Sequence, residues 1–178
     1  MKILRLMYGV PNSGKSHKAR RLAPAEHVYS TDDYFVNGNP GDRSPGGYKA
    51  NWHFTKLGLA HKWNQGNVRR ALAAGTPVVV VDNTNLKRRD AATYAKMASE
   101  FGYDVEIHES DAPWWLEIRL LLKDKEGNRP ALEAWALKLS EGFLHDGVRI
   151  GNDHGVPRDT ILRMLLDMEN YTVADLLG

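Results

Sequence analysis

The chain has 178 residues, of which 42% are hydrophobic and 26% charged, with no cysteine and a formal net charge of +2 at pH 7. This length suits one domain with a sizeable core, and the lack of cysteine excludes disulfides and thiolate metal sites. The small net charge does not by itself indicate a nucleic-acid partner. Without an apolar run of about 18 residues or room for a signal peptide before the first predicted strand, we expect a cytoplasmic protein.

The first predicted elements form a strand–loop–helix unit. Residues 3–7 are a short, mostly apolar run that a Gly-Val-Pro turn ends, which favours a strand. Residues 9–16 then read Gly-x-x-x-x-Gly-Lys-Ser, and a helix begins near residue 16. The apolar face of this helix consists of Ala19, Leu22 and Ala23.

This motif between a strand and a helix predicts a P-loop, whose backbone N–H groups and helix N-terminus bind phosphate oxygens. We expect Lys15 to contact the β- and γ-phosphates of ATP and the Ser16 hydroxyl to bind Mg²⁺. The alternative is a degenerate loop that binds an anion without turnover. The predicted nucleotide-binding residues are Gly9, Asn12, Ser13, Gly14, Lys15, Ser16 and His17.

Strands and helices alternate along the rest of the chain. Strands are predicted at 27–30, 76–81 and 105–108, and helices at 57–74, 87–101, 114–124, 130–143 and 158–168. The uninterrupted apolar run at 76–81 is typical of a central parallel strand, whereas the Gly- and Pro-rich residues 37–47 predict a mobile loop. The pattern predicts an α/β fold with a doubly wound parallel sheet. We expect one P-loop domain over residues 1–178, with a helical insertion or lid at about 113–157.

Polar clusters follow each of the first three predicted strands, at residues 9–16, 31–34 and 82–85. Because ligands of such folds bind beyond the carboxyl ends of the strands, these clusters should converge on one crevice.

Three motifs in this order resemble the P-loop polynucleotide 5′-kinases of phages and animals and their single-domain relatives. They are "GVPNSGKS", "STDDYF" and "VDNTN", and the resemblance covers most of residues 1–115 and 151–168. It implies a P-loop kinase fold that uses ATP and Mg²⁺ to phosphorylate a hydroxyl group, commonly the 5′-OH of DNA or RNA.

The resemblance also implies roles for two aspartates. The family's general base is the first aspartate of Asp-Asp-Tyr, which falls on Asp32. The alternative is that Asp32 or Asp33 only caps the following helix, and Asp33 is the better candidate for a cap. Asp82 resembles a Walker-B-type acid that binds Mg²⁺ directly or through water, although it could be a simple turn residue.

The acceptor side is less well matched. Thr84 and Asn85 correspond to the family's Thr-Asn and should form hydrogen bonds near the acceptor or the P-loop, while the aspartate of phage kinases falls on Asn83. An arginine that grips the acceptor phosphate in phage kinases is replaced by Phe35. The position of the lid arginine is Gly151, and Arg149 is the nearest substitute.

Several other residues have two interpretations each. Lys87, Arg88 and Arg89 begin a helix beside the expected crevice, where they either contact acceptor phosphates or form a solvated face. Arg43 is a candidate to replace the missing arginine. Trp114 and Trp115 are expected in the core rather than stacked on bases. Asn64 lies on an apolar helix face and should be bonded to backbone, and His154 is either a lid contact or an exposed loop residue.

The sequence therefore predicts a kinase that transfers the γ-phosphate of ATP to a nucleic-acid hydroxyl, with Asp32, Lys15 and Arg149 as catalytic residues. Ser16 and Asp82 would bind the metal. The predicted acceptor-binding residues are Asp33, Asn83, Thr84, Asn85, Lys87, Arg88, Arg43 and Phe35. One alternative changes the acceptor to a hydroxymethyl-modified base in DNA, a nucleoside or another small molecule. The other is a nucleotide-gated binding module that transfers little phosphate.

Overall fold

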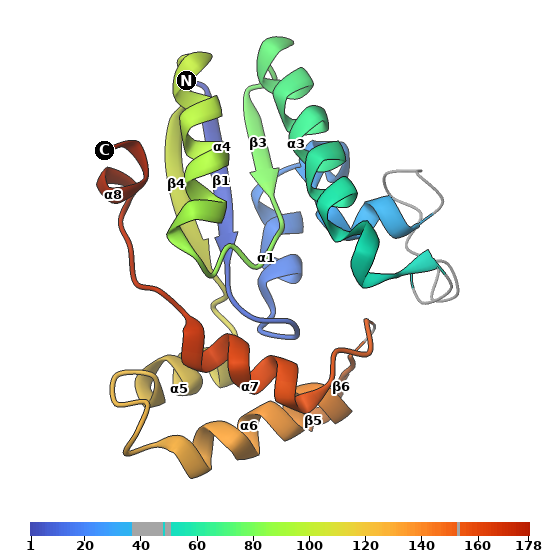
Figure 1. The fold of residues 1–178 in the computed structure, drawn as a ribbon, viewed down its shortest axis with the longest axis vertical. Helices are drawn as coiled ribbons and strands as arrows, with labels where there is room; N and C mark the ends of the chain where they lie inside the picture. Colours follow the sequence, from blue (N-terminus) through green and yellow to red (C-terminus); the bar gives the residue numbers. More distant parts are fainter. Residues whose placement is uncertain (37–47, 49–50, 153) are drawn as a thin grey trace.

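The structure is a computed structural model that describes residues 1–36, 48, 51–152 and 154–178. Within these residues, a parallel sheet of strand order β2-β3-β1-β4 forms the centre of the molecule (Figure 1). Its strands are β1 (Ile3–Tyr8), β2 (Val28–Tyr29), β3 (Val78–Val81) and β4 (Asp104–Glu109). β1 pairs with both β3 and β4, so the P-loop that follows β1 starts from the middle of the sheet.

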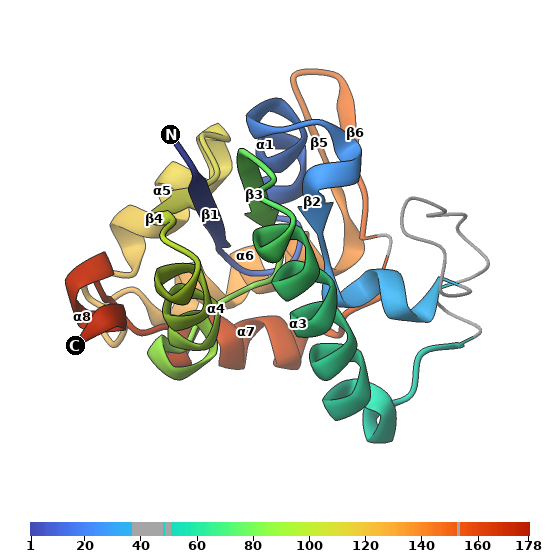
Figure 2. The same cartoon turned by 90° about the horizontal axis from the view of Figure 1, so that it is seen from above.

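Helices cover both faces of this sheet. α3 (Leu57–Ala73) and α4 (Arg88–Glu100) lie on one face, and α1 (Lys15–Leu22) lies on the other (Figure 2). Alternation along the strands decides which residues meet which layer: Leu4 and Leu6 pack with α3 and α4, whereas Met7 packs with Ala19 of α1. The predicted doubly wound α/β fold is confirmed.

A second layer of elements lies beyond the carboxyl ends of the strands (Figure 1). It contains α5 (Pro113–Leu121), α6 (Arg129–Glu141), α7 (Arg158–Asp167) and the antiparallel pair β5 (Phe143–His145) and β6 (Val148–Ile150). Its own core buries aromatic and aliphatic side chains from the three helices: Trp115, Ile118, Leu132, Leu139, Ile161 and Leu165. A short α8 (Val173–Leu177) then returns to pack on α4.

Residues 143–150 differ from the prediction of an all-helical lid. The helix expected over 130–143 ends at Glu141, and Phe143 begins a β-hairpin instead. The turn of this hairpin is Asp146-Gly147, with φ of 48° and 77°. Asp-Gly is a strong hairpin signal because both residues tolerate positive φ, and the helical interpretation overlooked it.

Shorter elements complete the described chain. Three 3-10 helices occur, η1 (Ala25–His27), η2 (Thr31–Phe35) and η3 (Phe54–Lys56), and η2 carries the Asp-Asp-Tyr motif. The loop predicted at 37–47, with Arg43, lies outside the described residues. None of the helices in the described part of the chain has the length and apolar character needed to cross a membrane.

Candidate functional site

The P-loop connects β1 to α1 through a tightly folded turn. Gly9 has φ of 145° and Gly14 has φ of 92°, values that side chains with a Cβ atom rarely adopt. A Cβ at Gly9 would lie 2.7 Å from Ser13 Oγ, and one at Gly14 would lie 2.5 Å from Ser110 Oγ. Both positions of the motif therefore need glycine in this fold.

The loop presents polar groups suited to a polyphosphate. Ser13 is fully buried, and its Oγ has no hydrogen-bond partner in the part of the chain that the structure describes. Lys15 begins α1, where the first N–H groups of the helix lack intrahelical acceptors. The Ser13 hydroxyl and the first N–H groups of α1 together fit the phosphates of a nucleotide.

Asp82 directly follows β3, in the segment whose Thr84 carbonyl oxygen is bonded to the P-loop. It is 4% exposed, and among the described residues its Oδ1 has no partner. A buried carboxylate oxygen without a partner is costly, and a bound cation relieves that cost. Ser16, in the first turn of α1, is partly buried and carries the hydroxyl that P-loops offer to a metal. These two residues fit a Mg²⁺ ion shared with nucleotide phosphates.

The three polar clusters at the carboxyl ends of the strands are bonded to one another. Gly9 N–H donates to the Thr84 carbonyl oxygen at 3.1 Å, and the Asn85 side chain donates to the Met7 carbonyl oxygen at 2.7 Å. Thr31 N–H donates to Asn83 Oδ1 at 2.9 Å. The segment after β3 therefore links the P-loop on one side with η2 on the other.

A buried hydroxyl supports the second of these links. Tyr94 of α4 accepts hydrogen bonds from the amides of Asn64 at 3.1 Å and Asn83 at 3.2 Å, and it is also hydrogen-bonded to the Thr31 side chain. Burial raises the pKa of Tyr94, so the phenol stays protonated. Asn64 was expected to bond to backbone, and its partner is this hydroxyl instead.

The two aspartates of η2 have different surroundings. Ser30 caps η2, because its Oγ accepts from Asp32 N–H at 3.2 Å while the Asp33 carboxylate accepts from Ser30 N–H at 3.3 Å. Asp33 is 4% exposed, whereas the Asp32 side chain is 45% exposed. The carboxylate of Asp33 therefore belongs to the cap, and that of Asp32 remains accessible.

Two rings from distant segments contact the Asp32 carboxylate. The Tyr48 hydroxyl is hydrogen-bonded to it, and burial together with the Asp32 charge raises the pKa of Tyr48, so the phenol donates. His154 Nε2 lies 3.6 Å from Asp32 Oδ2, and the His154 and Tyr48 ring centroids are 4.4 Å apart. No sequence pattern pointed to Tyr48, and His154 was expected either as a lid contact or as an exposed loop residue.

The three basic residues lie at the start of α4, with Lys87 as the residue before it and Arg88 and Arg89 as its first two residues. Lys87 Nζ donates to the Asp167 carbonyl oxygen at 2.8 Å and lies 3.5 Å from Glu169. The Glu169 carboxylate accepts from Arg88 N–H at 2.7 Å, a contact that lowers the pKa of Glu169. Lys87 is thus bonded to the chain that follows α7, while the Arg89 side chain is 86% exposed.

The remaining predicted residues are dispersed. Phe35 is 1% exposed and makes edge contacts with Tyr34 and Tyr48, so it is part of the packing behind Asp32. Arg149 Nη2 donates to the Glu141 carbonyl oxygen at 3.0 Å, at the end of α6. His17 is exposed on α1. The acceptor-binding role of Phe35, the catalytic role of Arg149 and the nucleotide-binding role of His17 stay predictions.

Comparison with known proteins adds the family to this geometry. A family model described as "AAA domain" matches residues 4–134. NEDD4-binding protein 2 of Homo sapiens is 31% identical over 173 residues, which is 95% of this chain and 8% of that protein. The chain thus covers a small part of the length of this relative. The region that the family model matches contains the P-loop, Asp32, Asp82, α5 and the first part of α6, and the chain belongs to this AAA domain family of P-loop, kinase-like proteins.

Proposed function

We propose that this protein transfers the γ-phosphate of ATP to a hydroxyl group of a nucleic acid. The observation that carries the proposal is the environment of Asp32. Its carboxylate is accessible, is not used as a cap, and already accepts a hydrogen bond from a hydroxyl group, that of Tyr48. A general base must make this kind of contact with the acceptor hydroxyl.

The chemistry then follows from the residues around the crevice. The acceptor oxygen bonds to the γ-phosphorus, the bond from that phosphorus to the β,γ-bridging oxygen breaks, and ADP leaves. The hydroxyl proton passes to Asp32. Lys15 neutralises charge on the β- and γ-phosphates, and Mg²⁺, held by Ser16 and Asp82, would supply further charge neutralisation.

The acceptor is proposed from the resemblance to polynucleotide 5′-kinases and from the histidines beside Asp32. His154 lies 3.6 Å from Asp32, and His61 lies 3.3 Å from the Thr31 hydroxyl. Such polar rings can contact phosphate or sugar groups of a nucleic acid. Phe35 favours a second candidate. This residue is buried and stands where phage kinases have the arginine that grips an acceptor phosphate. That candidate is a kinase of a smaller acceptor, such as a nucleoside or a hydroxymethyl-modified base.

A panel of acceptors tests both candidates. The protein is incubated with γ-labelled ATP, Mg²⁺ and, separately, 5′-OH DNA and RNA oligonucleotides, hydroxymethyl-base DNA and nucleosides. Label on the oligonucleotides supports the proposal, and label on nucleosides or on the modified base supports the second candidate. If ATP binds but none of these acceptors receives label, both give way to a nucleotide-gated binding module.

A further inference from the structure

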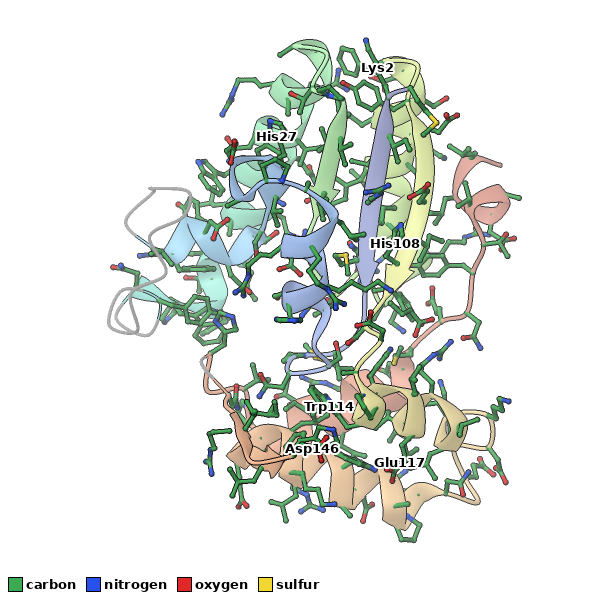
Figure 3. The ribbon with its side chains drawn as sticks, turned by 180° about the vertical axis from the view of Figure 1, so that it is seen from behind. Lys2, His27, His108, Trp114, Glu117 and Asp146 are labelled. Atoms are coloured by element: carbon green, nitrogen blue, oxygen red, sulfur yellow. The ribbon has the colours of Figure 1, made fainter. Side chains whose placement is uncertain are left out.

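The P-loop is held from outside by the second layer. The indole N–H of Trp114, on α5, donates to the Asn12 carbonyl oxygen at 3.0 Å. The side-chain amide of Asn12 in turn donates to the Leu139 carbonyl oxygen of α6 at 2.8 Å. Figure 3 labels Trp114 where the blue P-loop segment meets the gold and orange helices. Asn12 is one of the predicted nucleotide-binding residues; that role stays a prediction, and its side-chain amide is bonded to α6.

The C-terminal end of α6, which accepts the hydrogen bond from Asn12, also accepts hydrogen bonds from Arg149 and Asn152. An α-helix leaves its last carbonyl groups without intrahelical donors. In α6, three consecutive carbonyls accept from side chains: Leu139 from Asn12 at 2.8 Å, Ser140 from Asn152 at 2.9 Å and Glu141 from Arg149 at 3.0 Å. One helix terminus therefore fixes the P-loop and the segment that contains the predicted lid arginine.

The backbone of Asn12 needs such support. Its φ is 61°, in the left-handed region that few residues other than glycine adopt, although asparagine tolerates it better than most. Backbone in such a region persists where surrounding contacts determine it. Here the contacts are the hydrogen bond that the Asn12 carbonyl oxygen accepts from Trp114 and the one that the Asn12 side chain donates to the Leu139 carbonyl oxygen.

Trp114 is itself fixed by the hairpin and the loop. Its ring makes edge contacts with Phe143 at 5.6 Å and His145 at 5.0 Å, both on β5. On the other side, a Cβ at Gly14 would lie 3.5 Å from Trp114 Cζ2. The indole is thus packed between the P-loop and the β-hairpin.

We propose that Trp114 and Asn12 are positioning residues that hold the P-loop in its phosphate-binding shape through α5 and α6. The inference rests on the proposed donor site and adds the structural support of that site. A loop that is already ordered loses less conformational entropy when it binds phosphate, so releasing it weakens binding. Neither side chain needs to touch the nucleotide for this effect.

Trp114→Phe tests the inference, because it keeps an aromatic ring and removes the N–H donor. Trp135→Phe is the matched control: the Trp135 N–H donates to Glu117 Oε1 at 2.9 Å, and its ring contacts Phe143 at 5.7 Å. Figure 3 labels Glu117 on the gold α5 ribbon. Dissociation constants for ADP and for tripolyphosphate are measured by calorimetry, and thermal unfolding of both variants is compared.

The loss of one such hydrogen bond should raise both dissociation constants roughly three- to tenfold in Trp114→Phe. Trp135→Phe should bind as wild type, even where both variants unfold at the same lower temperature. In turnover assays, the KM for ATP should rise in Trp114→Phe, because the P-loop must first be ordered. The kcat at saturating ATP should change by less than about twofold, because the P-loop has the same shape once ATP is bound.

Asn12→Gly provides an independent variant. It keeps the left-handed backbone and removes only the bond to Leu139, and Asn128→Ala is its control because Asn128 donates to the Leu121 carbonyl oxygen at 2.9 Å. Asn12→Gly should weaken ADP binding as Trp114→Phe does. If neither variant changes the ADP or tripolyphosphate constants, the positioning role is wrong while the donor site stands. If wild type binds no ADP, the donor site itself is wrong.

Discussion

The P-loop lies between the segment after β3 and the second layer, and is bonded to both, whereas the Asp32 carboxylate is accessible. The loop is bonded to the segment after β3 through Gly9 and to the second layer through Asn12. The Asp32 carboxylate is 45% exposed and is contacted by two rings, Tyr48 and His154, from segments far apart in the chain. The proposed donor side is therefore held by the fold itself, and the proposed acceptor side by side chains from later segments.

Because the two regions are held differently, we expect some substitutions to affect every reaction and others to affect only some of them. Changes at the donor side should affect every reaction that uses ATP, whatever the acceptor. Changes around Asp32 should leave ATP binding intact and alter either proton transfer or the choice of acceptor.

The largest effect is expected at the base. Asp32→Asn keeps the shape of the side chain and removes the proton acceptor, so turnover should fall roughly 10²–10⁴-fold while the KM for ATP hardly changes. Asp33→Asn is the control, since an amide oxygen can still accept from Ser30 N–H and the effect should be mild. Steady-state kinetics with labelled ATP measure both. An inactive Asp33→Asn with an active Asp32→Asn would reverse the assignment.

The next effect is at the donor side. Lys15→Ala removes a cation that has no hydrogen bond or ion pair with any described residue, so the fold should be unchanged. Turnover should fall on the order of 10²–10³-fold with every acceptor, because charge on the transferring phosphates is no longer neutralised. Lys18→Ala, one turn further along α1, should have little effect. Near-normal turnover in Lys15→Ala would mean that the P-loop is not catalytic.

A smaller, selective effect is expected from Tyr48. Its hydroxyl occupies a hydrogen-bonding position on the Asp32 carboxylate that an acceptor hydroxyl also needs. Tyr48→Phe removes this competitor, so the KM for the acceptor should fall by about two- to tenfold while the KM for ATP is unchanged. Acceptor titrations at saturating ATP measure this. A lower kcat without a lower acceptor KM would show that Tyr48 supports Asp32 rather than competing with the acceptor.

Salt should produce the smallest effect. If the acceptor is a single strand, log–log plots of its affinity against salt should have a slope of roughly −0.7 per phosphate contact. Replacing both Arg88 and Arg89 with alanine should reduce the magnitude of that slope by about 1.4, which is roughly 0.7 for each lost phosphate contact. Lys87→Ala should leave the slope unchanged, because the Lys87 ammonium donates to the backbone carbonyl oxygen of Asp167 and lies 3.5 Å from the Glu169 carboxylate. A salt-independent acceptor KM would favour an uncharged small acceptor.

Much of the donor side could be predicted from the sequence because its signals are local. The Gly-x-x-x-x-Gly-Lys-Ser motif, the apolar run of β3 and the polar residues after each strand are contiguous, and rules for parallel sheets place their carboxyl ends together. The sheet and both helical layers follow from these signals. The hairpin at 143–150 was missed because a short apolar run next to a helix fits the periods of both a helix and a strand. Its Asp-Gly turn was nevertheless visible in the sequence.

The rest depends on contacts between residues that are distant in sequence. The bond from Trp114 to the Asn12 carbonyl group joins residues 102 positions apart, and that from Asn12 to Leu139 joins residues 127 apart. The periodicity of apolar residues does not predict that the Asn12 side chain reaches a carbonyl group at the end of α6. The approach of His154 to Asp32 depends on the path of the whole second layer, so the sequence suggested a candidate without a partner.

The central proposal is phosphoryl transfer from ATP to a nucleic-acid hydroxyl, and one pair of substrates tests it most directly. A single-stranded oligonucleotide with a 5′-hydroxyl group is compared with the same oligonucleotide carrying a 5′-phosphate, each incubated with γ-labelled ATP, Mg²⁺ and the protein. We predict that label appears at the 5′ end of the first oligonucleotide and not on the second. Absence of label from both, by a protein that binds ATP, would contradict a polynucleotide 5′-kinase activity.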